Sequence, residues 1–388
     1  MRVSSETKSQ VESPRADPQQ RSYPLVSVIL VCRWEARQIR TVLESILAQE
    51  EPDGGFEVIL ADGMSDDGTR EILEEIARSD PRVKVIDNPG RIASTGLNAA
   101  LRLARGQIII RMDAHTHYAS DYMRQCVSVL RSTGADNVGG PWVAQAHGYL
   151  GEAIAAAFQS PFAAGGARGH IPHYQGPVDT VYLGCWRREV FDRFGYFDED
   201  LARDQDDEHN LRIVRGGGRV WQSPKIRSWY HPRTSFKGLF EQYLQYGYWK
   251  VQVIRKHRLP ASWRHLVPGA FLLTLLLLCL AGALALPMAL LAPAGSAIRS
   301  LSSWLLTGAW LGLASILSVY VLALVVASVH AAGRTKWNLL PILPLAFCCY
   351  HFGYGCGFLK GLLDFVILRR NATASFARPS REVGLRLL

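Results

Sequence analysis

Four short apolar runs constrain the fold of this chain more than any other feature, because segments with apolar residues at helical spacing separate them. The runs are VSVILVC at 26–32, FEVILAD at 56–62, VKVID at 83–87 and QIIIRMD at 107–113. Near-continuous apolar strands are typical of a parallel sheet that is covered on both faces. Apolar residues at helical spacing separate them, as at Ile39, Val42 and Ile46. This order predicts a doubly wound, mostly parallel α/β domain whose ligands bind at the carboxyl ends of the strands.

The C-terminal third is apolar and predicts a membrane region. Two uncharged stretches, about 267–291 and 301–329, each exceed the roughly 20 residues that cross a bilayer. A third apolar stretch, about 339–358, contains prolines and a histidine, and it is either a third span or a re-entrant segment. Three spans are favoured because this stretch is uncharged and long enough. Before them, 236–265 mixes aromatic and basic residues, which favours interfacial helices over an aromatic core helix with a solvated basic face.

These patterns divide the chain into five parts. The sequence predicts a disordered tail at 1–23, an α/β domain at 24–235, interfacial helices at 236–265, a transmembrane region at 266–366 and a basic tail at 367–388. The first residues are polar and contain no signal peptide, so the α/β domain is expected on the cytoplasmic face of the cell (inner) membrane, below a multi-pass anchor.

The net charge and the cysteines indicate which binding partners and which kinds of site are expected. The net charge of +9 suits an anionic membrane surface or a phosphorylated substrate. No basic DNA-reading helix or aromatic-basic RNA-binding strand is recognisable, so nucleic acid is not expected as a partner. The seven cysteines form no CxxC pair, which argues against a zinc site or a disulfide framework.

Acidic residues end two of the predicted strands. Asp62 opens the segment DGMSDDGT, and Asp113 opens DAHTH. Both are expected at the same sheet edge, where carboxylates can contact a nucleotide sugar. Asp113 and His115 together are candidates for holding a divalent cation against a diphosphate, Mg²⁺ or Mn²⁺. The structural alternative for DGMSDDGT is an ordinary Asp/Gly turn with a helix cap, and for His115 it is a histidine that binds no metal.

A third acidic group is the run DQDDEHNLR at 204–212. A solvated acidic helix face is the simpler explanation of such a run. The functional one is a carboxylate base within hydrogen-bond reach of an acceptor hydroxyl.

Together these segments resemble glycosyltransferase family 2, which has the Rossmann-like GT-A fold. DGMSDDGT resembles the family's Asp-Gly-x-Ser-x-Asp-Gly-Thr block, MDAH stands at its Asp-x-Asp motif, and QDDEHNLR resembles its Glu-Asp-x-Asp-Leu-x-x-Arg block. The similarity covers about 24–249. Within the family, CRWEAR, RMDAH, VDTVYLG and YGYWK make the chain most similar to ExoA-like transferases of succinoglycan-type exopolysaccharide synthesis.

The resemblance implies a role for each matched residue. Asp206 would be the catalytic base, with Asp207 in reserve because the acidic run leaves the register open. The donor would contact Glu35, Asp62, Arg91 and Asp113, and the metal Asp113 and His115. The acceptor side would include Asp179, Gly184, Gln245 and Trp249.

Three positions depart from the family pattern. Trp34 replaces the usual Asn before Glu35, and His115 replaces the second Asp of Asp-x-Asp, which favours Mn²⁺. Tyr248 replaces the Arg of the Gln-x-x-Arg-Trp motif of processive synthases, which favours adding one sugar.

The resulting hypothesis is an inverting transfer from a UDP-sugar to a polyprenyl-diphosphate-linked saccharide at a lipid membrane. We expect four basic residues to hold the acceptor diphosphate: Arg233, Lys237, Lys250 and Arg255. Three alternatives remain open: a processive polysaccharide synthase, a transferase acting on polyprenyl phosphate, and a non-catalytic scaffold that binds nucleotide sugars.

Overall fold

The computed structural model describes residues 26–372 and 376, so the expected tail at 1–23 and most of the expected basic tail at 367–388 lie outside it. The N-terminal domain contains, in chain order, β1 Val26–Cys32, α1 Ile39–Leu47, β2 Phe56–Asp62, α2 Thr69–Ser79, β3 Val83–Asp87, α3 Ala93–Leu103, β4 Ile108–Asp113, β5 Thr116–Tyr118, α4 Tyr122–Thr133, β6 Asn137–Gly140, β7 Val143–Ala144, α5 Tyr149–Phe158, α6 Pro161–Ala164, η1 Arg168–His170, β8 Gly176–Pro177, β9 Tyr182–Arg187, α7 Glu189–Phe194, α8 Gln205–Arg215, β10 Val220–Gln222 and β11 Ser228–Tyr230. The C-terminal part contains α9 Phe236–His257, η2 Trp263–His265, α10 Val267–Leu291, α11 Ala297–Arg334, η3 Trp337–Leu339, α12 Leu343–Gly361 and η4 Leu362–Ile367.

The central sheet has the strand order β3-β2-β1-β4-β9-β6-β10-β8. The first four strands are parallel, as the apolar runs predict. β9 is antiparallel to both of its neighbours, so the sheet is mixed beyond β4. Opposite the end of β1, Cys32 pairs with Asp62 and Val31 with Asp113. The structure therefore confirms that the two acidic strand ends lie at one edge of the sheet.

Side-chain alternation along β1 divides the core into two layers. Val28 and Leu30 belong to the layer that α1, α2 and α4 cover, whereas Ile29 faces the layer that α3, α7 and α8 cover. These strand residues are fully buried on both faces. Because neither face contacts solvent, apolar side chains are needed at successive positions, which is why the strands appear in the sequence as near-continuous apolar runs.

α9 packs closely against α12 rather than lying apart from the protein. A stripe of glycines on α12, Gly353, Gly357 and Gly361, meets the backbone of α9, and small residues are what permit such an approach. The aromatic side chains of Tyr248 and Trp249 are buried in this contact. The aromatic side chains of this half of α9 are thus core residues, and Lys250 beside them is buried as well, whereas an interfacial position of 236–265 stays a prediction.

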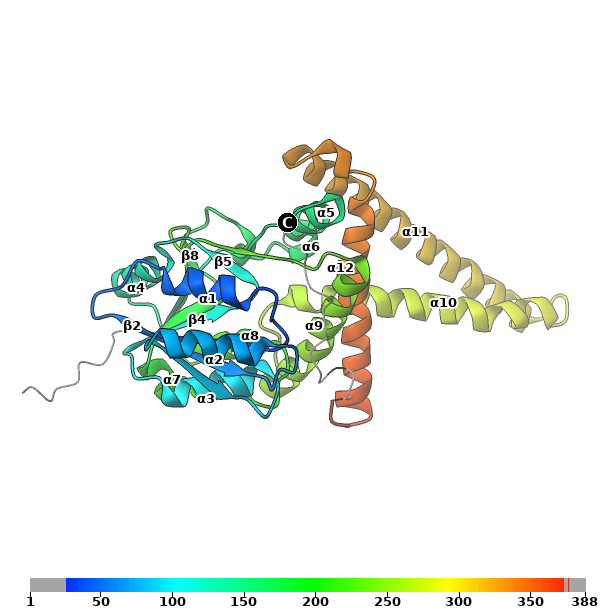
Figure 1. Cartoon of the computed structure of the whole chain (residues 1–388). Helices are drawn as coiled ribbons and strands as arrows, with labels where there is room; N and C mark the ends of the chain where they lie inside the picture. The colour runs from blue at the N-terminus through cyan, green and yellow to red at the C-terminus, as the bar shows by residue number, and fades with distance from the viewer. Residues whose placement is uncertain (1–25, 373–375, 377–388) are drawn as a thin grey trace, which may run out of the picture.

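Two helices among the described residues are long and apolar enough to cross a membrane, α10 and α11. They form a hairpin that projects from the rest of the molecule (Figure 1). Large apolar side chains cover its surface, and Leu291 is 83% exposed. α12 lacks this exposure because it packs on α9 and α5, and a third span therefore stays a prediction.

Candidate active site

One cavity of about 1210 Å³ contains most of the predicted site residues. It opens at the carboxyl ends of β1 and β4 and continues to the C-terminal helices, where Phe271, Tyr320 and Tyr350 line it. Predicted residues in its wall are Glu35, Arg91, Asp113, His115, Asp206 and Asp207. Residues of the domain and of the helical region therefore enclose the same space.

Asp62 supports the cavity wall from behind. Its side chain is 2% exposed, and it accepts hydrogen bonds from the Ser65 backbone N–H at 3.1 Å and the Ser65 hydroxyl at 2.6 Å. The next residue, Gly63, lines the cavity, and its N–H donates to the Cys32 carbonyl at 2.9 Å. The carboxylate thus fixes the turn after β2, and direct donor contact by Asp62 stays a prediction.

His115 is tied to Glu35. Its Nε2 lies 3.0 Å from the Glu35 carboxylate, and its Nδ1 lies 2.7 Å from the amide nitrogen of Gln38. The His115 backbone N–H donates to Asp113 Oδ1 at 2.9 Å. Burial disfavours the charged imidazole, but the Glu35 carboxylate outweighs it, and the pKa of His115 is raised above its ordinary value.

The side chains at the end of β4 supply only some of the ligands that a divalent cation needs. A carboxylate and an imidazole side by side fit Mn²⁺. Both ring nitrogens of His115, however, contact Glu35 and Gln38. The described residues form no group of three or more side chains that could hold a metal ion. A cation here needs phosphate oxygens to complete its coordination, as is common when substrate carries a diphosphate.

The acidic run at the start of α8 is not a solvated face. Lys250 of α9 is 4% exposed, and its ammonium lies 3.0 Å from Asp204 and 2.5 Å from Asp207. Burial opposes the charge on Asp207, yet Lys250 lowers the pKa of Asp207 to about 2. Burial raises the pKa of Asp204 to about 7, since burial and the nearby charges of Asp207 and Asp206 together outweigh the lowering effect of Lys250.

Asp206 has a different environment from Asp207. Its side chain is 33% exposed, and its carboxylate lies 3.3 Å from the guanidinium of Arg111, which is 9% exposed. The contact is longer than that between Lys250 and Asp207. A carboxylate that accepts a proton must be reachable by the donor hydroxyl and not fully neutralised. The two side chains are similarly exposed, at 33% for Asp206 and 31% for Asp207, but Lys250 pairs with Asp207 at the shorter distance, so Asp206 meets this condition better.

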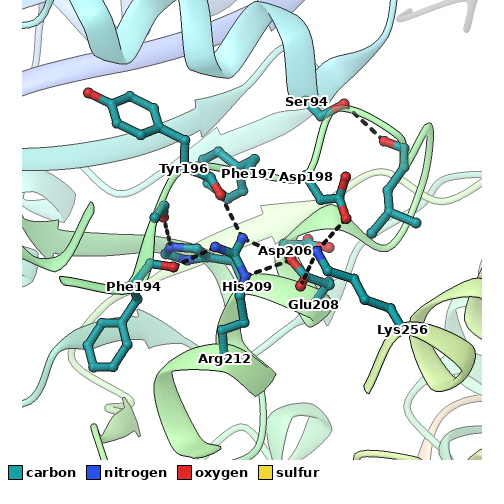
Figure 2. A network of polar contacts seen from close by, with 12 residues as sticks. Ser94, Phe194, Tyr196, Phe197, Asp198, Asp206, Glu208, His209, Arg212 and Lys256 are labelled. Carbon is teal, nitrogen blue, oxygen red and sulfur yellow. Dashed lines mark hydrogen bonds and ion pairs between the residues drawn. The ribbon is translucent and has the colours of Figure 1, made fainter. Parts of the chain in front are cut away.

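Figure 2 shows how the following turn of α8 is fixed. Glu208 is fully buried and accepts from Arg212 at 3.0 Å. Arg212 also donates to the carbonyls of Phe194 and Tyr196. Lys256 of α9 bridges Glu208 and Asp198. These contacts anchor α8 so that Asp206 and Asp207 are held at the cavity.

The predicted acceptor-side residues lie behind the cavity wall. Asp179 pairs with Arg264, and Gln245 accepts a hydrogen bond from Arg203 at 3.1 Å. The two arginines line the cavity, whereas Asp179 and Gln245 do not. Gly184 and Trp249 are buried without lining the cavity. None of the four is among the lining residues, so the structure gives them supporting positions.

The basic residues expected to hold a diphosphate are separated in the structure. Arg233 lines the cavity, whereas Lys237 and Arg255 are exposed outside it. Lys250 lines the cavity as the partner of two carboxylates, so its charge is already compensated. The expected cluster of four cations does not form, because the helical period places these side chains on different faces of α9 and its preceding loop.

Sequence reasoning missed Arg111 and the aromatic residues of the cavity. Arg111 interrupts an apolar run, and a charged residue within a buried strand was a usable signal. Trp142, Phe158, His170, Tyr182 and Tyr230 come from five separate segments and line the cavity together. No local pattern brings those five into one group.

Comparison with known proteins shows what this chain is similar to. Residues 27–188 match the model of the family described as glycosyl transferase family 2. The succinoglycan biosynthesis protein ExoA of Rhizobium meliloti (strain 1021) is 29% identical over 353 residues, which cover 87% of this chain and 95% of that protein. A dolichyl N-acetyl-α-D-glucosaminyl phosphate 3-β-D-2,3-diacetamido-2,3-dideoxy-β-D-glucuronosyltransferase of Methanococcus voltae is 22% identical over 345 residues, 87% of this chain and 97% of its own.

A solved structure supports the fold. The mannosyltransferase PcManGT from Pyrobaculum calidifontis, in complex with GDP-Man and Mn²⁺, matches with a TM-score of 0.52 and 20% identity. The match covers 88% of this chain and 87% of that one. Together with the family match, it confirms the fold that the strand and motif patterns predict.

Proposed function

We propose that the chain, whose residues 27–188 match glycosyl transferase family 2, transfers one sugar from a UDP-sugar to a polyprenyl-diphosphate-linked saccharide, with inversion, at a membrane. The observation that carries this proposal is the continuity of the cavity. Asp113 and Asp206 line the same space as Phe271 and Tyr320 of the apolar hairpin. A lipid-linked saccharide is an acceptor that needs contact with both regions. The similarity to a succinoglycan biosynthesis protein supports a role in exopolysaccharide or related glycan synthesis.

The catalytic step follows from the placement of Asp206. Its carboxylate takes the proton of an acceptor hydroxyl, and that oxygen attacks the anomeric carbon as the bond to UDP breaks. Arg111, at 3.3 Å, orients the carboxylate before the transfer. Asp207 is the weaker candidate because Lys250 already neutralises it.

Donor binding is assigned to the β1 and β4 side of the cavity. Glu35 and Arg91 line it there, and Asp113 ends β4 beside them. Asp113 would hold a divalent cation together with oxygens of the donor diphosphate, and His115 would join it only after leaving Glu35. Such a cation neutralises the charge that builds on the departing diphosphate.

The membrane part of the proposal rests on α10 and α11. Their length and exposed apolar surface support insertion of the hairpin into a bilayer. With the α/β domain on the cytoplasmic side, the cavity would face both a soluble nucleotide sugar and the lipid surface.

Transfer assays with the purified, detergent-solubilised protein test this function. A panel of UDP- and GDP-sugars is combined with undecaprenyl phosphate and undecaprenyl-diphosphate-linked mono- and disaccharides, with Mg²⁺ or Mn²⁺. We expect one sugar to be added to a diphosphate-linked saccharide. Asp206→Asn should reduce kcat by about 100- to 10,000-fold, the usual contribution of a general base.

Matched variants make the result interpretable. Asp207→Asn removes a carboxylate of the same helix turn and should reduce kcat less than Asp206→Asn does. Full activity of a folded Asp206→Asn protein would exclude Asp206 as the base. Transfer to undecaprenyl phosphate alone would contradict the proposed acceptor. A polymeric product would contradict the addition of a single sugar.

A further inference from the structure

We propose that Trp142 and His170 form a subsite that binds a sugar ring of the acceptor saccharide through hydrogen bonds to its hydroxyl groups. The proposal deepens the proposed function and rests on it. Trp142 lies between β6 and β7, and His170 ends η1. Both line the cavity that contains Asp113 and Asp206.

An aromatic cluster surrounds these two side chains. The Trp142 ring stacks on Tyr182 with centroids 5.0 Å apart and an interplanar angle of 11°. Its centroid is 5.6 Å from that of His170, and Phe158 lies 4.5 Å from His170. All four residues line the cavity. Ligand sites commonly combine such apolar aromatic walls with a few fixed polar groups.

Two polar atoms of this cluster lack partners among the described residues, whereas the Tyr182 hydroxyl is paired with Thr116. Trp142 Nε1 and His170 Nδ1 are buried and make no hydrogen bond within the described part of the chain. Leaving a buried polar group unsatisfied costs about 1–3 kcal/mol, so hydrogen bonds from a ligand to both atoms favour its binding. Most buried polar atoms in proteins are paired, and these two therefore call for an explanation.

The two atoms offer complementary hydrogen bonds. Burial lowers the pKa of His170 to about 4, so the imidazole is neutral at pH 7 and one ring nitrogen can accept. The indole N–H of Trp142 can only donate. Hydroxyl groups both donate and accept, and a sugar ring presents them beside apolar C–H groups.

The position of the cluster favours the acceptor over the donor. Trp142 and Tyr182 lie on the β9 and β6 side of the sheet, whereas the donor residues lie on the β1 side. His170 is close enough to Arg264 and Asp207 for their charges to influence its pKa.

The segment before His170 also connects to the C-terminal helices. The carbonyl of Phe162 in α6 lies 2.9 Å from His351 Nε2 of α12. The subsite therefore lies between the carboxylates of α8 and the helices that would contact the lipid, where the saccharide of a lipid-linked acceptor has to be.

Kinetics of two cavity variants test the subsite. Trp142→Phe keeps an aromatic ring and removes only the indole N–H, and His170→Leu removes the ring nitrogens. Both are assayed with the UDP-sugar and undecaprenyl-diphosphate-linked saccharide that the wild type turns over fastest. We expect the acceptor KM to rise about tenfold in each variant, while the donor KM and the slow hydrolysis of donor without acceptor stay within twofold.

The chain offers a matched control. Trp221 of β10 also has a buried Nε1 without a partner, but it does not line the cavity. Trp221→Phe should leave both KM values unchanged. A higher donor KM with an unchanged acceptor KM would assign the subsite to the donor sugar, and unchanged values in both cavity variants would show that no sugar contacts these atoms. Either result overturns the proposal. If the wild type transfers to no lipid-linked saccharide, the proposed function fails first, which is a separate outcome.

Discussion

Replacing Lys250 with Met should destabilise the protein more than any exposed ion-pair mutation. The side chain is 4% exposed and its ammonium contacts Asp204 at 3.0 Å and Asp207 at 2.5 Å. Met preserves most of the volume and removes the charge. Removing one partner of a buried ion pair costs about 3–5 kcal/mol, because the remaining charge stays buried without compensation. At about 2–4 °C per kcal/mol, this corresponds to a fall in Tm of about 6–20 °C.

The loss of stability caused by Lys250→Met should increase as the pH rises. Lys250 holds the pKa of Asp207 at about 2, and without it burial raises that pKa above its unfolded value of about 3.9. The folded variant then binds more protons than the unfolded chain, so its stability falls as pH rises. The deficit relative to wild type should be larger at pH 8 than at pH 5.

Thermal unfolding in detergent, followed by tryptophan fluorescence at both pH values, measures this effect. The control is Lys336→Met, the same change at an ion pair with Glu152 in which the lysine is 60% exposed. Exposed pairs contribute about 0–1 kcal/mol, so that Tm should barely move. A Lys250→Met protein that loses no more Tm than this control, or loses the same at both pH values, would refute the assignment of Lys250 as the compensating charge.

Three further predictions follow from the site and the helix packing. Asp113→Asn should weaken the dependence of UDP binding on Mn²⁺, measured by calorimetry with and without the metal, whereas an unchanged dependence would remove Asp113 from the metal site. Gly357→Ala should lower Tm by overpacking, about 1–3 kcal/mol, because its Cβ would meet the Leu244 carbonyl, while Gly308→Ala, in open space within α11, should be neutral or stabilising. Glu208→Gln should reduce Tm by leaving Lys256 without its buried partner, and a Tm equal to wild type would show that this ion pair is dispensable.

The parallel strands were predictable because each depends only on residues within its own segment of the chain. A strand buried on both faces needs an apolar run, and the acid that follows it lies at the end of that strand by necessity. Asp62 and Asp113 could therefore be placed at one edge before any tertiary contact was known. The long uncharged stretches that became α10 and α11 were equally local. The antiparallel β9 was not predictable in this way, since strand direction depends on which strands pair.

The family motifs took the prediction to the level of single residues. They made Asp206 the candidate base and kept Asp207 in reserve, because the acidic run left the register open. What separates the two carboxylates in the structure is Lys250, which is 43 positions from Asp207 in the chain and reaches it only when α9 packs beside α8. Arg111 is likewise distant in sequence from Asp206.

The acidic strand ends and the apolar C-terminal region were thus determined by the sequence itself, since each depends on residues within one element. The tertiary structure alone decided which carboxylate is neutralised, and it brought Trp142 and His170 into the cavity from separate loops. It also decided that the aromatic face of α9 is buried, because a stripe of glycines on α12 lets the two backbones approach. Burial and charge pairing depend on what surrounds a side chain, and those surroundings come from parts of the chain that no local pattern connects.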